Sequence, residues 1–415
     1  MNFFQPNQVL ARSIMNWILY GVTFVITILS LISTAFPALV LRMMGGLTDN
    51  AGINPFEPGF YFVPLIVANL SLLFVGILCN KEKLPNLLKR SIKYIFNFEI
   101  NTRITFLIII ILIGFYLIFT VEELYNGEYF PDYYIRVQER LENYDPMVIG
   151  EYGIGKHIAI FLDWVGLQIF GIDKASAIFS SVFLILMTYL VTAQIAKKRF
   201  AGILAMLIMI SSGLFIFYDT SVTYPNHWIA FYLLSIYLLS NKWPFSPISY
   251  IFSVFSKGLS IIFFPANVFF IYNMKISKKK KLKLLTPYVA IGIIGIVLIQ
   301  SGFNFGPESI PYTDFKYHDF WGGFGELNAA LRNDPLVLLF LPSLIVGLFF
   351  ISKKGIIHAD SITFMILILL IHPSLLVAFS EHHNIMYRMI PIIPFFAMGV
   401  GLLFSKRPTA QFSQS

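Results

Sequence analysis

The stretch ITFLIIIILIGFYLIFT, residues 104–120, holds no charged side chain. Folded as a helix, a run of this length crosses a hydrocarbon core of about 30 Å. Lipid gives the backbone no other hydrogen-bond partner, so a spanning segment must be a helix or belong to a closed barrel. Comparable apolar runs recur along the chain, and alternating strand patterns are absent. The sequence therefore predicts an all-α polytopic membrane protein.

Composition supports this fold class. Hydrophobic residues make up 57% of the 415 residues and charged residues 13%, with a mean hydropathy of +0.74. These values lie outside the range of soluble globular domains. The first apolar run has no cleavage site followed by a soluble domain, so we expect a retained span rather than a signal peptide. Cys79 is the only cysteine, which excludes an intrachain disulfide.

The charges predict the topology, because basic loops face the cytoplasm. The basic segments are KEKLPNLLKRSIKY with Arg103, residues 197–199, residues 275–283, Lys353 with Lys354, and Lys406 with Arg407. With all of them inside, nearly every acidic residue lies outside. The net charge of +8 is thus explained by membrane orientation and contact with anionic lipid, and we expect no nucleic-acid partner.

This topology predicts about 10 full spans and one broken or re-entrant helix pair. The expected spans are 14–38, 60–79, 104–120, 174–195, 200–217, 225–240, 285–300, 335–352, 361–379 and 389–404. Residues 244–274 join two inside loops, so they must dip in and return, with a bend at Lys257–Gly258. One long helix over 244–274 would place the basic segment 275–283 outside, against the charge rule.

Three parts are expected along the chain. Residues 1–100 hold two extra N-terminal spans and a basic inner loop, residues 101–407 form a catalytic core, and residues 408–415 are a disordered tail. The core has two large outer loops, 121–173 and 301–334. No internal repeat is found.

The first outer loop carries seven acidic residues between Glu122 and Pro146, directly after a span. A carboxylate there could take a proton from an acceptor hydroxyl. Asp132 is a candidate base, although its place before a helical segment also suits an N-cap. Glu122 and Glu123 are the rival candidates. The charges at residues 139–142 are expected to form a solvated helix face.

Cationic side chains could bind a phosphate. The candidates are Lys156, His157, Lys257, His383 and Arg388. His382 and His383 adjoin Glu381, but adjacent side chains diverge and no HxxxH spacing is present. We therefore expect no divalent metal and no other cofactor.

Taken together, the order of elements over residues 104–404 resembles the GT-C superfamily of membrane glycosyltransferases, including the dolichyl-phosphate-mannose protein mannosyltransferases. The resemblance lies in layout and in short motifs. These motifs are PDYYIRVQERL at 131–141, GKHIAIFLDWVGLQIFGI at 155–172, TYPNHWIAFYLLSIYLLSNKWP at 223–244, SKGLSIIFFP at 256–265 and MYRMIPIIPFF at 386–396.

The resemblance implies an enzyme that moves a sugar, with inversion, from a polyprenyl-phosphate donor to a glycan, lipid or protein acceptor at the outer face of the cell membrane. Asp132 then matches the position of the base and Arg388 that of the arginine near the donor phosphate. The usual His-Pro-Pro reads Lys156-His157-Ile158-Ala159 here, and no acidic pair adjoins Asp132. The base assignment thus stays open between Asp132 and Glu122–Glu123.

Two other functions compete with this one. A lipid or glycolipid transporter or flippase would be expected to show repeated halves and ionisable groups within the spans. A non-catalytic scaffold would keep the fold without the chemistry. Large acidic and aromatic outer loops favour binding of a polar substrate such as a sugar, although aromatic residues also gather at membrane interfaces for physical reasons.

Overall fold

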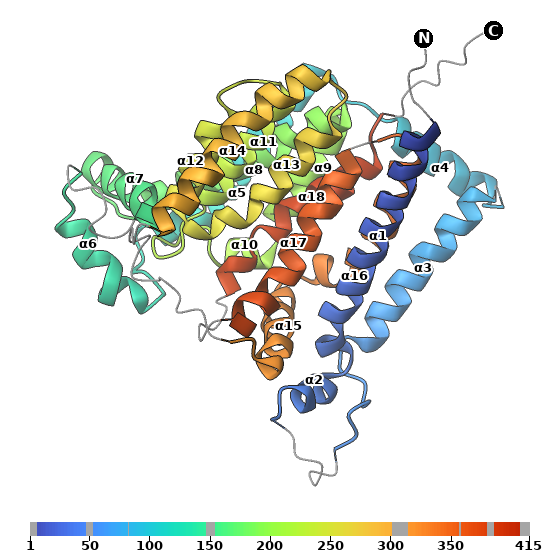
Figure 1. The fold of residues 1–415 in the computed structure, drawn as a ribbon, viewed down its shortest axis with the longest axis horizontal. Coiled ribbons are helices and arrows are strands. Elements are labelled where there is room, and N and C mark those ends of the chain that lie inside the picture. The colour runs from blue at the N-terminus through green and yellow to red at the C-terminus, as the bar shows by residue number, and fades with distance from the viewer. Residues whose placement is uncertain are drawn as a thin grey trace. The chain divides into compact units, whose positions relative to one another are not determined.

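The computed structural model describes residues 6–46, 53–81, 83–146, 154–300, 314–356, 358–379 and 386–406, and the described part of the chain is helical without strands (Figure 1). Six helical segments are long and apolar enough to cross a membrane. They are Ile14–Ala35, Thr102–Leu124, Ala175–Ala196, Pro335–Lys353, His358–Phe379 and Met386–Leu403. The prediction of an all-helical membrane protein is thus confirmed at this level, and the count of about ten spans stays a prediction.

The chain divides into two compact units. Unit 1 combines Met1–Phe98 with Pro311–Ser415, and unit 2 is Glu99–Ile310. The two N-terminal apolar helices therefore pack with the C-terminal helices of the chain, and the predicted core 101–407 includes parts of both units. This grouping gives the N-terminal helices a structural role that their sequence did not indicate.

Unit 1 is built around α1. Its helices are α1 (Pro6–Ala35), α2 (Pro37–Met43), α3 (Phe62–Asn80), α4 (Asn86–Asn97), α15 (Tyr317–Leu331), α16 (Pro335–Lys353), α17 (His358–Phe379), η5 (Met386–Met389) and α18 (Ile392–Leu403). Helix α1 packs against α15, α16 and α17. Buried polar pairs fix these contacts: Tyr20 donates to Asp360 at 3.1 Å, and Thr34 donates to Asn328.

A close helix approach in unit 1 requires a glycine. At Gly323 of α15, a Cβ atom would lie 2.4 Å from the Cα of Ser374 in α17. No side chain fits at that distance, so glycine lets the two helices touch through their backbones. This contact brings α15 and the middle of α17 together near η5, which α15 also contacts.

Unit 2 contains the following helices. They are α5 (Thr102–Thr120), η2 (Val121–Leu124), η3 (Tyr133–Val137), α6 (Gln138–Glu142), α7 (Ile154–Phe170), α8 (Ala175–Ala196), α9 (Arg199–Ile210), α10 (Gly213–Ile216), α11 (His227–Ser240), α12 (Ser246–Ser256), η4 (Gly258–Phe263), α13 (Phe264–Asn273) and α14 (Lys278–Gln300). Helices α8, α9, α11 and α12 form its centre through the pairs α8–α9, α8–α11 and α11–α12.

The turn between α8 and α9 follows from local chemistry. Lys197 ends α8 in the left-handed conformation, with φ 54°. Helix α9 then folds back against α8 at Gly202, where a Cβ would lie 2.7 Å from the ring of Tyr189. A larger residue would separate the helices.

The break predicted at Lys257–Gly258 is present. Helix α12 ends at Ser256, and Lys257 has extended backbone angles, φ −155° and ψ 117°. The chain continues as the 3₁₀ helix η4 before α13 begins at Phe264. Phe263, at the end of η4, stacks on Tyr232 of α11 with ring centroids 4.2 Å apart. Packing onto α11 thus holds the irregular segment in place.

Candidate functional site

The acidic loop of unit 2 binds a second loop through a row of hydrogen bonds. Glu123 accepts one from the Thr220 hydroxyl at 2.6 Å. Glu128 accepts from the Ser221 hydroxyl at 3.0 Å and from the Val222 amide at 3.1 Å. Asp132 accepts from the Tyr224 hydroxyl at 2.8 Å. We call these three carboxylates and their partners on residues 220–224 the carboxylate ladder.

The ladder begins where α5 ends. The last turn of α5 continues as η2, so Glu123 emerges directly from the apolar helix that opens the unit. Aromatic contacts brace the row: the ring of Phe130 stacks on Tyr218 with centroids 5.1 Å apart and meets the edge of Tyr224 at 5.0 Å. These contacts fix the backbone on both sides of the ladder, so its carboxylates have defined positions.

The three ladder carboxylates differ in exposure. Glu128 is 8% exposed. Burial raises its pKa above the ordinary value, while the bonds from Val222 and Ser221 and the charge of Lys174 lower it. Asp132 is half-buried, and its bond to Tyr224 is its only hydrogen bond to a described residue. Glu123 is also half-buried, so Glu123 and Asp132 are both more accessible than Glu128 to a molecule outside the protein.

The expected N-cap at Asp132 is not formed. Asp132 does precede the helical turn Tyr133–Val137, but its side chain makes no capping hydrogen bond. The hydroxyl of Tyr224, 92 positions later in the chain, donates a hydrogen bond to the carboxylate instead. A tertiary hydrogen bond thus replaces the helix cap that the local sequence suggested.

Asp219, beside the ladder, is a buried carboxyl group without ordinary hydrogen bonds. Its side chain is 1% exposed, and neither oxygen has a partner of hydrogen-bond geometry among the described residues. The pKa of Asp219 is raised to about 7, mainly by burial; the nearby Tyr116 hydroxyl opposes this rise and the charge of Glu123 adds to it. Both protonation states are therefore populated near neutral pH.

A polar cavity of about 390 Å³ lies next to the ladder. Its wall includes Glu128 of the ladder, Asp173, and three tyrosines, Tyr125, Tyr133 and Tyr134. Two of these rings are largely exposed, Tyr125 at 78% and Tyr134 at 58%. Tyr133 donates its hydroxyl to Asp173, and burial raises the pKa of this tyrosine above its ordinary value. Carboxylates beside flat aromatic rings suit a polyhydroxylated ligand.

The basic candidates of unit 2 come from two elements that meet. Lys156 and His157 lie in the first turn of α7 and are half-buried. Lys257 precedes Gly258, whose Cβ, if present, would lie 3.9 Å from the Cα of Gly155. The bend between α12 and η4 therefore reaches the beginning of α7. A helix N-terminus with nearby cations favours an anion.

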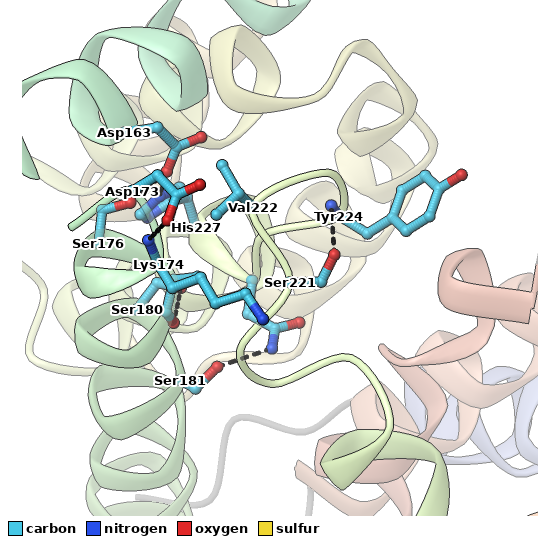
Figure 2. A network of polar contacts seen from close by, with 12 residues as sticks. Asp163, Asp173, Lys174, Ser176, Ser180, Ser181, Ser221, Val222, Tyr224 and His227 are labelled. Atoms are coloured by element: carbon cyan, nitrogen blue, oxygen red, sulfur yellow. Dashed lines mark hydrogen bonds and ion pairs between the residues drawn. The ribbon is translucent and has the colours of Figure 1, made fainter. Parts of the chain in front are cut away.

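A second polar group lies deeper, between α7, α8 and α11 (Figure 2). Asp163 of α7 is 2% exposed. One of its oxygens, Oδ1, bonds both the Ser176 hydroxyl and Nε2 of His227, the latter at 3.1 Å. A serine–histidine–aspartate relay needs histidine between the other two residues. Here aspartate is central, so this group is not a hydrolase triad.

The remaining candidates differ in their surroundings. Glu122 is exposed, and no hydrogen bond to its side chain is observed among the described residues. In unit 1, Arg388 of η5 is 6% exposed, and its Nε has no hydrogen-bond partner in the described part of the chain. His372 of α17 is near enough for the charge of Arg388 to act on its ring. His383 lies outside the described residues.

No metal site is apparent within the described ranges. There, no group of three or more histidine, cysteine, aspartate or glutamate side chains could hold a metal ion.

Sequence reasoning missed Glu128, Asp219 and the partner loop 220–224 as parts of the site. The string DTSVTY at 219–224 was a usable signal, because six residues with four hydrogen-bonding side chains besides Asp219 stand between two apolar helices. Comparisons of the whole chain with protein-family models, with curated proteins and with solved structures found no match. The site's geometry and the motif resemblance are therefore the basis for a functional proposal.

Proposed function

We propose that this protein is a membrane glycosyltransferase that moves a sugar from a polyprenyl-phosphate donor to an acceptor at the outer face of the cell membrane. The observation that carries the proposal is Asp132, a half-buried carboxylate fixed by Tyr224 and located shortly after an apolar helix. A lipid-linked sugar presents its head group at this level of the membrane. The proposal includes about ten spans and one re-entrant pair formed by α12 and α13.

In the proposed reaction, an acceptor hydroxyl oxygen attacks the anomeric carbon of the donor sugar and forms the new carbon–oxygen bond. The bond from the anomeric carbon to the phosphate oxygen breaks, and its electron pair leaves with the polyprenyl phosphate. Asp132 takes the hydroxyl proton as general base. Such assistance contributes roughly 10²- to 10⁴-fold to a rate. Attack opposite the leaving group inverts the anomeric configuration.

The motif resemblance favours Asp132 over Glu122–Glu123, since Asp132 matches the position of the base. The Tyr224 hydroxyl donates to one oxygen of Asp132, which orients the carboxylate. Glu123 is bound to Thr220, and Glu122 is exposed without an observed hydrogen bond that would orient it. In this proposal Glu123 and Glu128 hold the loop that supplies Tyr224.

In this proposal, cationic side chains stabilise the leaving phosphate. Lys156, His157 and Lys257, at the beginning of α7, would bind and neutralise the departing phosphate in unit 2. Arg388 of unit 1 is a further candidate for binding an anionic ligand, because its buried guanidinium has no partner at Nε among the described residues. No step of the reaction requires a metal ion in this proposal.

Transfer of radiolabelled sugar from a polyprenyl-phosphate donor in proteoliposomes tests the proposal. Asp132→Asn keeps the size of the side chain and removes the base, so we expect transfer to fall by at least about 100-fold. Glu139→Gln, a change at an exposed residue of the neighbouring α6, is the matched control and should retain full activity.

Two outcomes would overturn the proposal. Transfer unaffected by Asp132→Asn would exclude this residue as the base. A wild-type protein that never consumes the donor, yet moves lipid across the vesicle bilayer, would favour the transporter alternative.

A further inference from the structure

Two cavities of opposite character lie at the C-terminal end of α7 in unit 2. The polar cavity described above includes Leu167 and Gly171 in its wall. A second cavity, of about 300 Å³, has Gly166 and Phe170 in its wall, together with residues of α8 and α11. Successive positions of the same stretch of chain thus line different cavities.

The polar cavity carries carboxylates but no cationic side chain among its described lining residues. Glu128, Glu142 and Asp173 are its acidic members. Gln138, which donates to Glu142 at 2.9 Å, and Asn126 add amide groups, and the tyrosines add flat rings. Lys174 is near Glu128 but points its amine to the Gly127 carbonyl, at 3.1 Å. This wall suits an uncharged or amine-bearing sugar and disfavours a phosphate.

The second cavity is lined by apolar residues except for Ser176, Ser180 and His227. These three side chains already have partners within the protein. Ser176 and His227 both bond Asp163, as Figure 2 shows, and Ser180 donates to the Ala177 carbonyl. The polar groups of the wall are thus satisfied internally, so this apolar cavity suits a hydrocarbon chain rather than a polar ligand.

The edge of the apolar cavity is formed by exposed apolar side chains. Ile169 is 67% exposed, Phe170 51% and Phe179 59%. Phe179 belongs to α8, one of the helices long and apolar enough to cross a membrane. This exposed apolar edge suits contact with a lipid chain rather than with water.

We infer that the two cavities together bind one amphiphile, a neutral or amine-bearing glycolipid, with its sugar in the polar cavity and its hydrocarbon chain in the apolar cavity. The inference rests on the proposed function and names the acceptor of that transfer. The acceptor is then a membrane lipid that carries a sugar, not a soluble glycan or a polypeptide. Its sugar lies beside Glu128, in the same wall as the loop that leads to Asp132.

Photo-crosslinking tests this inference without any donor. The probe is a neutral glycosyl diacylglycerol with a diazirine in one acyl chain, added to the full-length protein in phosphatidylcholine nanodiscs. Mass spectrometry locates the crosslinks. We expect them in residues 162–170 and 179–183. Excess unlabelled glycolipid should compete at least about ten-fold better than phosphatidic acid with the same chains or than a chainless methyl glycoside.

Matched variants separate the two cavities. Val165→Trp fills the apolar cavity and should lower crosslinking at least five-fold, whereas Ile110→Trp, on an exposed face of α5, should not. Phe179→Ala, which changes an exposed residue and should fold normally, removes one side of the apolar edge. Phe115→Ala on α5 is its control at 55% exposure. Glu142→Gln should reduce the preference over phosphatidic acid, while Glu139→Gln should leave it unchanged.

Crosslinks spread evenly over the apolar helices, or equal competition by phosphatidic acid, would overturn the inference. So would crosslinking insensitive to both Val165→Trp and Phe179→Ala. These outcomes can be distinguished from failure of the proposed function. A protein that transfers sugar to a soluble acceptor would keep the proposed function and lose this inference. A protein that binds the glycolipid in both cavities but never consumes a donor would lose the proposed function alone.

Discussion

The carboxylate ladder of unit 2 and Arg388 of unit 1 differ in how their charged groups are hydrogen-bonded. Glu123, Glu128 and Asp132 each have a hydrogen-bond partner on one loop. Arg388 is slightly more buried than Glu128, yet its Nε has no such partner among the described residues. Satisfied charges hold a fold in place, whereas a buried donor without a partner is costly unless a ligand completes it. The ladder is thus expected to organise the site and Arg388 to bind substrate.

The largest effect should come from Arg388, because its role in the proposal is binding an anion. Arg388→Ala should lower kcat/KM for the donor by about 10²- to 10³-fold, the usual loss on removing a group that stabilises developing charge. Arg388→Lys should retain part of the activity. Steady-state transfer kinetics measure both.

Arg332→Ala, at an exposed arginine just after α15, is the control for charge removal in unit 1. If Arg388→Ala lowered stability and left kcat/KM unchanged, the contrast between the two regions would be lost, since Arg388 would then be structural.

Glu128→Ala should mainly affect stability. The Ser221 hydroxyl and the Val222 amide would lose their acceptor in a buried place, at a cost of about 2–4 kcal/mol in the free energy of unfolding. Glu128→Gln keeps an acceptor oxygen and should cost less. Thermal unfolding in detergent measures the difference between the two variants, and equal destabilisation would show that hydrogen bonding is not the reason for Glu128.

Asp219 predicts that the stability of the protein falls as pH rises. A carboxylate paired with a cation has the opposite effect on stability. Its pKa is about 7 in the folded protein, because burial disfavours the charged form. The folded state therefore binds more protons than the unfolded state between about pH 4 and pH 7, so this group's contribution falls as pH rises through that window. The loss is complete above pH 7 and amounts to roughly 4 kcal/mol at most.

Asp219→Asn should remove this loss. The variant should exceed the wild type in unfolding temperature at pH 8 and by much less at pH 5. A variant with the same advantage at both pH values would show that Asp219 does not titrate in this range. Thr188→Val, in the centre of unit 2 and without a titratable group, is a control for the pH series.

The smallest loss of stability should come from removing the hydrogen bond between Thr220 and Glu123 in the ladder. Thr220→Val keeps the shape of the side chain and removes one hydroxyl donor to Glu123. A bond to a charged acceptor contributes about 1.5–3 kcal/mol at most, and Glu123 is half-buried, so we expect roughly 1 kcal/mol. Thr223→Val is the control, because Thr223 lies in the same loop but makes no hydrogen bond to a ladder carboxylate. If Thr223→Val cost as much, the ladder would have no special role in holding this loop.

The sequence predicted what depends on local physics. Long apolar runs predicted the helices, and the basic segments on both sides of residues 244–274 predicted the break at Lys257–Gly258 that the structure contains. The sequence also drew attention to the acidic loop as a whole. These features follow from hydrophobicity and backbone preference, which are properties of neighbouring residues.

The arrangement of the site depends on distant residues, so it could not be predicted in the same way. Glu128 is one of seven acidic residues in its loop, and only the contact with residues 221 and 222, more than 90 positions away, distinguishes it. Asp132 looked equally suited to cap a helix. The grouping of the first 98 residues with residues 311–415 also follows from tertiary packing alone.

The stereochemistry of the transferred sugar tests the central claim most directly. Proton NMR of the first-formed product, with a donor of known anomeric configuration, reports whether the configuration at C1 has changed. A single displacement assisted by Asp132 predicts complete inversion, which Asp132→Asn would slow without altering. Retention of configuration would require a glycosyl-enzyme intermediate or another two-step route, and would contradict the role of Asp132 as general base.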